Sequence, residues 1–361
     1  MISFYGRVNE PDVLNAGSEF LRVSEKMVVG NPLFLCTFVT AIKPIFQFSI
    51  TMTNVTGFFS KIKALLLSYP DKDYIDWQIA GLKRSVMESH TSPLLIQNLL
   101  YRTEPGVSSV RCCGEELIVS LSTFGRRIHG VALTIESLME QTVRPNRIIL
   151  NLDSEFGKPG RIPGSLKLLE KRGLEIRFSR DCGPYMKLLP TLRDFPEATV
   201  ITVDDDILYD YDFISTLVNA HICNPQAVVA PRCRVMELVG GELKLPFVDW
   251  RFAPNDCEPS PLLQPEGVRG VLYPPHSLDE RVFDEKLFMS LCPSTDDFWF
   301  KTMGLLHGTQ VVKCYADDER ANPVNSRSDV SCTLHAVNHT LDGYDSQWKA
   351  LFDHFGLGRY F

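Results

Sequence analysis

From Leu117 onward, short apolar segments alternate with amphipathic helical segments, and this rhythm constrains the fold more than any other feature. The expected strands are 117–121, 147–152, 174–178, 199–203, 228–230 and 310–312. The expected helices are 165–172, 185–193, 296–306 and 344–355, with two more whose buried faces carry Val131, Ile135, Leu138 and Met139, and Phe213, Ile214, Leu217, Val218 and Ile222. Strands that alternate with helices through short connections predict a doubly wound, mostly parallel α/β sheet with helices on both faces.

Two regions depart from this rhythm. Residues 1–110 contain apolar patches and expected helices but no chemical motif, and they predict a mainly helical accessory region. A turn signal at 103–106 marks the boundary, so the α/β domain is expected to span 111–361. Acceptor docking, oligomerisation and attachment to a membrane surface remain open as roles of the first region. Residues 232–295 contain many prolines and glycines and predict a loop-rich insertion.

Composition limits the class of protein. The net charge of −7 argues against a general nucleic-acid binder, which would carry a basic surface. The ten cysteines include the adjacent pair Cys112-Cys113 but no CxxC, so they favour a reducing compartment and do not predict a zinc site. The N-terminus lacks a signal-peptide pattern, and the apolar stretch 33–42 is far shorter than the ~20 residues of a membrane span. A cytoplasmic protein is expected, with peripheral attachment to the inner face of a membrane left open.

Three consecutive carboxylates, Asp204-Asp205-Asp206, directly follow the apolar run 199–203. Charged side chains at this position are not expected in the core, because unpaired buried charge costs several kcal/mol. The carboxyl end of a parallel strand is also where α/β folds bind their ligands. Carboxylates favour hard divalent cations, and Mg2+ or Mn2+ typically keeps substrate phosphates in its remaining positions. The triplet therefore predicts a metal-assisted diphosphate site, with a solvated turn or helix cap as the alternative.

Several motifs, taken in order, resemble those of family-2-type glycosyltransferases with the GT-A fold. The segments 117–124, 135–142 and 201–209 resemble the first strand, the following helix and the DxD-bearing strand of that family. The chain is more closely similar to a bacterial subgroup with TxxRI, YxKL, DDDxxY and GVLYPP motifs, which correspond here to 123–128, 185–188, 204–209 and 270–275. The resemblance covers roughly Cys112 to the C-terminus. It implies transfer of a sugar from a nucleoside-diphosphate sugar with help from Mn2+ or Mg2+.

The same resemblance implies roles for residues around the donor. Asp206 would bind the cation directly, and Asp204 and Asp205 would contact the ribose or the cation. Further contacts to the nucleotide sugar are implied for Thr123, Arg127, Asp153 and Lys187. An exposed surface position is the alternative for Arg127 and Lys187, and a solvated strand-end turn is the alternative for Asp153.

A second acidic pair, Asp296-Asp297, stands at the start of an expected helix. Carboxylates there also favour the helix dipole and cap free N–H groups, which is the structural alternative. The resemblance implies that Asp297 is the base that removes a proton from the acceptor hydroxyl, preceded by Asp296. Relatives usually carry Glu-Asp here, so the Asp-Asp pair leaves open which carboxylate serves. Transfer would then invert the anomeric configuration without a covalent intermediate.

Aromatic and histidine side chains complete the candidate set. Tyr273 is expected to bind the acceptor by stacking on a sugar ring, with a core tyrosine as the alternative. Trp250 and Trp299 are expected in the core. His335 or His339 would complete the metal shell if they act as C-terminal histidines do in some GT-A enzymes.

The sequence does not determine the donor sugar, the acceptor or the linkage. A UDP-sugar donor is favoured because uracil is the commonest base in such relatives. The implied acceptor is a glycan or lipid-linked glycan of bacterial polysaccharide synthesis. A sugar-nucleotide pyrophosphorylase is one alternative, but 122–127 lacks the glycine-rich, basic loop that it needs. A non-catalytic nucleotide-sugar-binding protein with a degenerate fold is the other, and two intact acidic clusters argue against it.

Overall fold

The computed structural model describes residues 92–255, 258–314, 322–323 and 343–361. Most of the expected accessory region and both His335 and His339 lie outside these residues. Within the described part, the segment just before β1 belongs to the α/β unit, because the amide of Gly106 donates to the carbonyl of Arg172 at 2.9 Å and that of Ser108 to the carbonyl of Pro145 at 2.9 Å.

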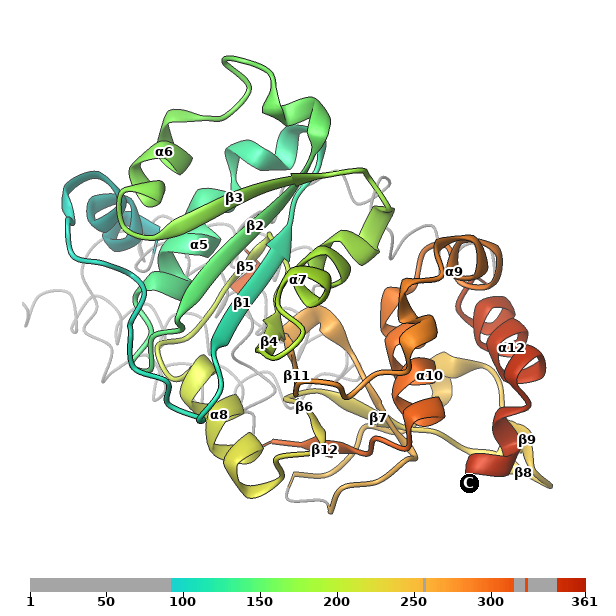
Figure 1. Cartoon of the computed structure of the whole chain (residues 1–361). Coiled ribbons are helices and arrows are strands. Elements are labelled where there is room, and N and C mark those ends of the chain that lie inside the picture. The colour runs from blue at the N-terminus through green and yellow to red at the C-terminus, as the bar shows by residue number, and fades with distance from the viewer. Residues whose placement is uncertain (1–91, 256–257, 315–321, 324–342) are drawn as a thin grey trace, which may run out of the picture. The chain divides into compact units, whose positions relative to one another are not determined.

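A seven-stranded sheet in the order β12-β6-β11-β4-β1-β2-β3 forms the centre of the described unit (Figure 1). Its strands are β1 (Leu117–Ser122), β2 (Arg147–Asp153), β3 (Leu174–Ser179), β4 (Thr199–Thr202), β6 (Val228–Ala230), β11 (Val271–Tyr273) and β12 (Val311–Lys313). β1 pairs in parallel with β2 and β4, whereas β11 runs antiparallel to both β4 and β6. The expected mostly parallel sheet is confirmed. The expected loop-rich insertion is corrected in one respect, because it supplies the central strand β11.

Shorter elements surround the sheet. The small strands are β5 (Ile207–Leu208), β7 (Cys233–Val235), β8 (Leu238–Val239), β9 (Glu242–Leu243), β10 (Leu263–Pro265) and β13 (Asn322–Pro323). Residues 92–101 are helical. The α-helices that follow are α5 (Val131–Met139), α6 (Gly164–Glu170), α7 (Leu189–Asp194), α8 (Phe213–Cys223), α9 (Glu285–Leu291), α10 (Asp296–His307) and α12 (Gly343–Phe355). The 3-10 helices are η3 (Gly125–His129), η4 (Ser154–Gly157), η5 (Gly183–Lys187), η6 (Phe247–Asp249), η7 (Gly267–Arg269), η8 (Glu280–Phe283) and η10 (Leu357–Tyr360).

Side-chain alternation along the strands divides the core into two layers. Leu117, Val119 and Leu121 of β1 belong to the hydrophobic cluster that includes α5, α6 and α8. Ile118 points to the opposite face, whose cluster includes α7, α10 and α12. In Figure 1, α9, α10 and α12 lie together beside the end of the sheet that contains β11. Because successive residues of a strand face opposite sides, buried strands covered on both faces are mostly apolar, as they are here apart from Ser120, Asn151 and the two threonines of β4.

Two helix predictions need correction. The expected helix 185–193 is divided into η5 and α7, with an irregular Leu188 (φ −122°) between them and Pro190 in the first turn of α7. Proline removes a backbone donor and favours a first helical turn, so α7 starts anew there. On α8, Ile222 is 56% exposed and His221 is buried instead, so the apolar face was assigned wrongly at its last position.

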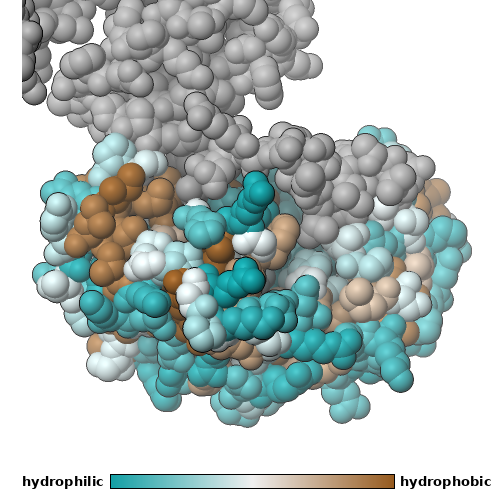
Figure 2. Space-filling model, turned by 90° about the horizontal axis from the view of Figure 1, so that it is seen from above, coloured by the Kyte–Doolittle hydropathy of each residue, from teal (hydrophilic) through white to brown (hydrophobic). Residues whose placement is uncertain are grey.

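The described surface is mostly polar on one side. Figure 2 shows hydrophilic residues over most of the coloured part of that face, with a hydrophobic area to one side. None of the helices in the described residues combines the length and apolar character that crossing a bilayer requires.

Candidate active site

The two acidic clusters, far apart in the sequence, meet around one lysine. Asp204 follows β4 and Asp296 begins α10, while Lys187 ends η5. Lys187 Nζ lies 3.5 Å from Asp204 Oδ1, 3.1 Å from Asp296 Oδ2 and 4.0 Å from Asp297 Oδ1. The site therefore lies at the carboxyl end of β4, the edge where α/β sheets bind ligands. The alternative of an exposed Lys187 is excluded, because only 13% of its side chain is exposed.

Polar side chains beneath η5 hold Lys187 in place. The hydroxyl of Ser120 donates to the backbone carbonyl of Lys187 at 2.7 Å and lies 2.6 Å from the hydroxyl of Thr191. The amide of Asn151 donates to both hydroxyls at 3.1 Å. These groups are buried, and the bonds among them restrict the local geometry, although Oδ1 of Asn151 has no hydrogen-bond partner among the described residues. Sequence reasoning missed them, although a serine and an asparagine inside buried strands are a visible signal.

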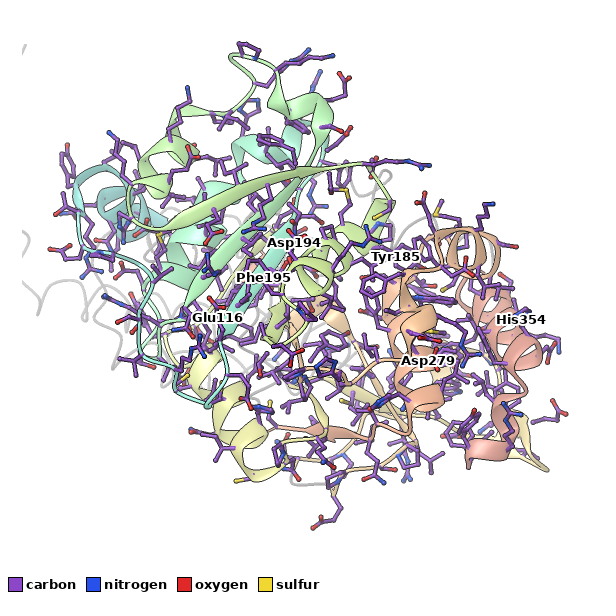
Figure 3. All side chains as sticks on the ribbon, viewed as in Figure 1. Glu116, Tyr185, Asp194, Phe195, Asp279 and His354 are labelled. Atoms are coloured by element: carbon purple, nitrogen blue, oxygen red, sulfur yellow. The ribbon has the colours of Figure 1, made fainter. Side chains whose placement is uncertain are left out.

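Tyr185 connects the same segment to the helices that carry the second acidic pair. Its side chain points from η5 toward α9 and α10 (Figure 3). Its ring stacks on Phe288 of α9 with centroids 3.9 Å apart and meets Phe300 of α10 edge-on at 5.7 Å. Its hydroxyl donates to the carbonyl of Cys292. The YxKL segment thus places its tyrosine in the core and its lysine in the site.

The charge balance around Lys187 favours its ammonium form. Burial opposes this charge, but Asp296, Asp204 and Asp297 together raise the pKa of Lys187 well above its ordinary value. A buried cation among several carboxylates lowers the cost of keeping those carboxylates together. Lys187 therefore acts as the fixed counter-charge of both acidic clusters.

One carboxylate oxygen of Asp297 accepts a backbone hydrogen bond, and the other lies 4.0 Å from the ammonium nitrogen of Lys187. The amide of Gly267 donates to Asp297 Oδ2 at 2.8 Å, and 27% of the Asp297 side chain is exposed. Burial raises the pKa of Asp297 to about 7, against the opposing effect of Lys187. Its neighbour Asp296 is buried and paired with Lys187. Burial raises the pKa of Asp296 as well, so accessibility distinguishes the two: 27% of the Asp297 side chain is exposed against 9% of Asp296, and a base must reach the acceptor hydroxyl. The contribution of Gly267 was not foreseen from the sequence.

Asp205 lies inside the protein rather than toward a ligand. It is 8% exposed, and its carboxylate accepts hydrogen bonds from the hydroxyl of Thr123 and from Nε of Arg127 at 3.0 Å, with a second bond from the Arg127 guanidinium. Burial raises the pKa of Asp205, and Arg127 opposes this. The expected ribose or cation contact of Asp205 does not fit this placement. Thr123 is buried as well, and its hydroxyl makes this internal bond.

Asp204 and Asp206 fit a divalent cation better. Their side chains are 29% and 34% exposed, and both offer the hard oxygen ligands that Mn2+ and Mg2+ prefer. Arg127 Nη2 lies 2.9 Å from Asp206 Oδ2, and the Asp204 amide donates to the hydroxyl of Tyr209 at 3.0 Å. Burial raises the pKa of Asp206, and Arg127 opposes this while Asp204 adds to it. Two nearby carboxylates that repel one another are a donor set that a cation would stabilise.

Asp153 and Tyr273 are the remaining candidates around the donor and the acceptor. Asp153 Oδ1 accepts from the amide of Glu155 at 3.3 Å at the start of η4, as expected for a strand-end turn. Tyr273 is 2% exposed and meets Phe300 edge-on, so the core alternative holds and the expected stacking on a sugar does not fit. Trp250 and Trp299 are buried as expected.

Comparisons with known proteins give little beyond this geometry. No protein-family model matches the sequence, and no curated protein matches it. Among solved structures, the chain is similar to the mannosyltransferase PcManGT from Pyrobaculum calidifontis, in complex with GDP-Man and Mn2+. The identity is 16%, the match covers 42% of this chain and 46% of that chain, and the TM-score is 0.27. An overlap this small leaves the function to be argued from the site itself.

Proposed function

We propose that the protein is a metal-dependent, inverting glycosyltransferase that moves a sugar from a nucleoside-diphosphate sugar to a hydroxyl group of a glycan or lipid-linked glycan. The observation that carries this proposal is the meeting of Asp204 and Asp296-Asp297 around Lys187 at the carboxyl end of β4. One cluster supplies oxygen ligands for a cation, and the other supplies a base. A GT-A-type site needs both within reach of the same sugar.

The chemistry assigned to the protein's own residues is simple. Asp297 takes the proton from the acceptor hydroxyl as that oxygen attacks the anomeric carbon. A new carbon–oxygen bond forms on one face of the sugar while the bond to the diphosphate breaks on the other, so the configuration inverts. Gly267 fixes the orientation of Asp297 through its amide.

Asp204 and Asp206 would hold the cation, which supplies Lewis-acid stabilisation of the charge on the departing nucleoside diphosphate. Arg127, beside Asp206, is positioned to add positive charge near that group. UDP is the first donor class to test, with the sugar and the acceptor left to experiment.

A thermal-unfolding panel tests the proposal. Nucleoside diphosphates and nucleotide sugars are each combined with Mn2+, Mg2+ or EDTA and added to the wild type, Asp206→Ala and Asp353→Ala. Asp353 serves as a matched control because it pairs with Lys349 on α12, 56% exposed and outside the site. A ligand present at 100 times its dissociation constant adds about 2.7 kcal/mol to the free energy of unfolding.

We expect one nucleotide class to raise the unfolding midpoint of the wild type and of Asp353→Ala only with metal, and to leave Asp206→Ala unchanged. Slow release of nucleoside diphosphate from the stabilising donor would then separate an enzyme from a non-catalytic binding protein. A flat panel for the wild type across all donors and metals would refute the proposal.

A further inference from the structure

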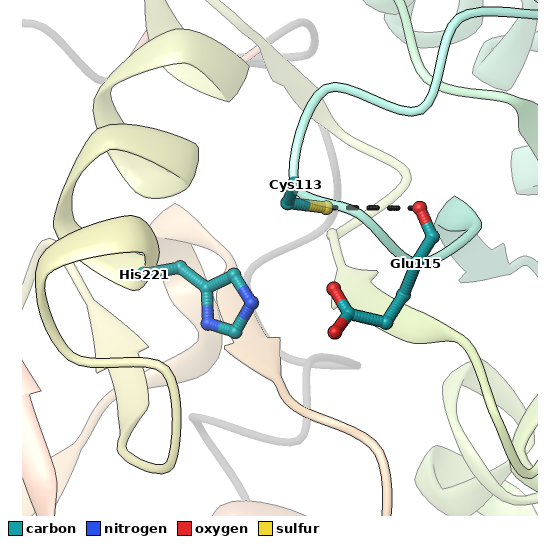
Figure 4. A group of neighbouring side chains, drawn as sticks. All are labelled: Cys113, Glu115 and His221. Carbon is teal, nitrogen blue, oxygen red and sulfur yellow. Dashed lines mark hydrogen bonds between the residues drawn. The ribbon is translucent and has the colours of Figure 1, made fainter.

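Three side chains with metal-binding atoms lie close together near the amino-terminal ends of β1 and β4, whereas the acidic clusters lie at the carboxyl ends. Cys113 and Glu115 lie just before β1, and His221 lies in the last turn of α8 (Figure 4). One ligand atom from each, the thiol sulfur, a carboxylate oxygen and an imidazole nitrogen, all lie within 4.8 Å of one another. Figure 4 shows the imidazole and the carboxylate on facing elements, with the cysteine above them.

Two of the three side chains in this cluster carry a buried polar atom without a hydrogen-bond partner among the described residues. His221 is only 3% exposed, yet its Nδ1 atom has no hydrogen-bond partner among the residues that the structure describes. The same holds for Oε2 of Glu115 and for the hydroxyl of Thr199 at the start of β4. The thiol of Cys113 makes a long contact of 3.9 Å to the carbonyl of Glu115, and the side chains of Cys112 and Thr199 are close enough to influence its pKa. Each unpaired buried polar atom costs about 1–3 kcal/mol, so several in one place indicate that a ligand satisfies them.

The donor set selects the kind of ligand. Sulfur, imidazole nitrogen and carboxylate oxygen together match zinc, whereas Mg2+ and Ca2+ prefer oxygen alone. Ligands of a tetrahedral zinc ion lie about 3.5 Å apart, given Zn–S and Zn–N bonds of about 2.3 and 2.0 Å. Atoms within 4.8 Å of one another reach that spacing through small side-chain rotations.

We propose that Cys113, Glu115 and His221 bind a zinc ion that fastens the end of α8 to the segment before β1. The absence of CxxC spacing argued against a zinc site in the sequence, but the fold assembles these ligands from two distant segments. The side chains of Cys113 and Glu115 are partly exposed, so a water molecule has access to the fourth position. This ion would be distinct from the cation expected at the acidic triplet, because the two sites lie at opposite ends of β4.

The test uses the full-length protein after treatment with a chelator. Co2+ is titrated first, because a thiolate bound to Co2+ gives a charge-transfer absorption band that oxygen ligands do not give. The acidic triplet, with oxygen ligands only, therefore cannot produce this signal. Zn2+ is then added to displace the Co2+ and to measure the unfolding midpoint. The variants are Cys113→Ser and Glu115→Gln. Cys223→Ser is the matched control, since Cys223 is an exposed free thiol on α8, the helix that carries His221.

We expect the band in the wild type and in Cys223→Ser, its loss in Cys113→Ser, and an affinity for Zn2+ at least about 10-fold weaker in Glu115→Gln. Zn2+ should also raise the unfolding midpoint of the wild type. Circular dichroism checks that each variant folds; if Cys113→Ser does not fold, Glu115→Gln decides the question. A wild type without the band, a band that persists in Cys113→Ser, or Glu115→Gln with unchanged affinity would each overturn the proposal.

Discussion

The amide nitrogen of Gly267 lies 2.8 Å from Oδ2 of Asp297. A side chain at position 267 would have no room, because a Cβ atom there would lie 2.7 Å from Oδ1 of Asp297 and 3.1 Å from Nζ of Lys187. The start of η7 therefore sets the position of the candidate base by direct contact. Both crowded atoms are ends of side chains, so a substitution would displace the side chains of Asp297 and Lys187 rather than the backbone.

Gly267→Ala should consequently separate activity from stability. We expect kcat to fall about 100-fold, because a displacement of about 1 Å is enough for such a loss, while the free energy of unfolding falls by only about 1–2 kcal/mol. Rate assays and urea unfolding measure the two effects. The matched control is Gly304→Ala in α10, where the nearest atom to the added Cβ is 3.8 Å away. This control should keep full activity and gain up to about 1 kcal/mol. Equal activity in both variants would contradict the assigned role of Gly267.

Most strands of the sheet could be predicted, because each is marked by a local pattern of apolar residues. β1 and β2 are mostly apolar and β3 alternates apolar with polar residues, so each strand is visible in the sequence. The three lie next to one another in parallel, as the alternation with helices predicts. β11 could not be found this way. Val271–Tyr273 is three residues long between a glycine and two prolines, and its place between β4 and β6 depends on pairing across the fold.

The candidate site was predictable in position but less so in the roles of its residues. The carboxylates after β4 predicted a ligand site at the carboxyl end of this strand, because an unpaired charge in the core is costly. Which carboxylate turns inward depends on Thr123 and Arg127, whose bonds to Asp205 connect segments about eighty residues apart. Likewise, His221 was overlooked because an isoleucine next to it matched the apolar pattern better.

Asp205 and Asp206 should respond differently to loss of charge. Asp205→Asn removes the charged acceptor of Arg127 and Thr123, so we expect a loss of about 2 kcal/mol in the free energy of unfolding with metal-dependent binding retained in the folded fraction. Asp206→Asn alters a partly exposed side chain, so we expect a change within about 1 kcal/mol and no stabilisation by nucleotide plus Mn2+. Urea unfolding with and without Mn2+ and nucleotide measures both. The reverse pattern would show that Asp205, and not Asp206, faces the cation.

Lys187→Met should destabilise the protein in a pH-dependent way. The change leaves Asp204 and Asp296 without their counter-charge, which costs about 3 kcal/mol at neutral pH. Burial already raises the pKa of Asp296, and without the ammonium this pKa rises further above that of the unfolded chain, so the deficit shrinks as pH falls and the carboxyl becomes protonated. Urea unfolding at pH 7.5 and pH 4.5 follows this trend. Lys158→Ala removes an exposed pair with Glu155 and should change stability by less than about 1 kcal/mol at either pH. A deficit independent of pH would mean that packing, and not charge, is the role of Lys187.

The pH profile of the reaction should identify the base. Because burial raises the pKa of Asp297 to about 7, the rate at saturating metal should reach half its maximum near that pH and level off about one pH unit higher, as the carboxyl becomes fully deprotonated. Asp297→Asn should lower the rate at least about 100-fold and abolish this rise.

Asp296→Asn offers the sharper comparison, since it keeps the volume of the side chain and removes only the neighbouring charge. The charge on Asp296 contributes to raising the pKa of Asp297, and its loss frees Lys187 to act more strongly on Asp297. Both effects lower the pKa of Asp297, so the inflection of the Asp296→Asn profile should move to lower pH while a substantial rate remains. Initial rates measured from pH 5 to pH 9 with the donor that stabilises the protein provide the test. If Asp296→Asn instead abolished the rate and Asp297→Asn only shifted the inflection, Asp296 would be the base and the contact between Gly267 and Asp297 would serve packing alone.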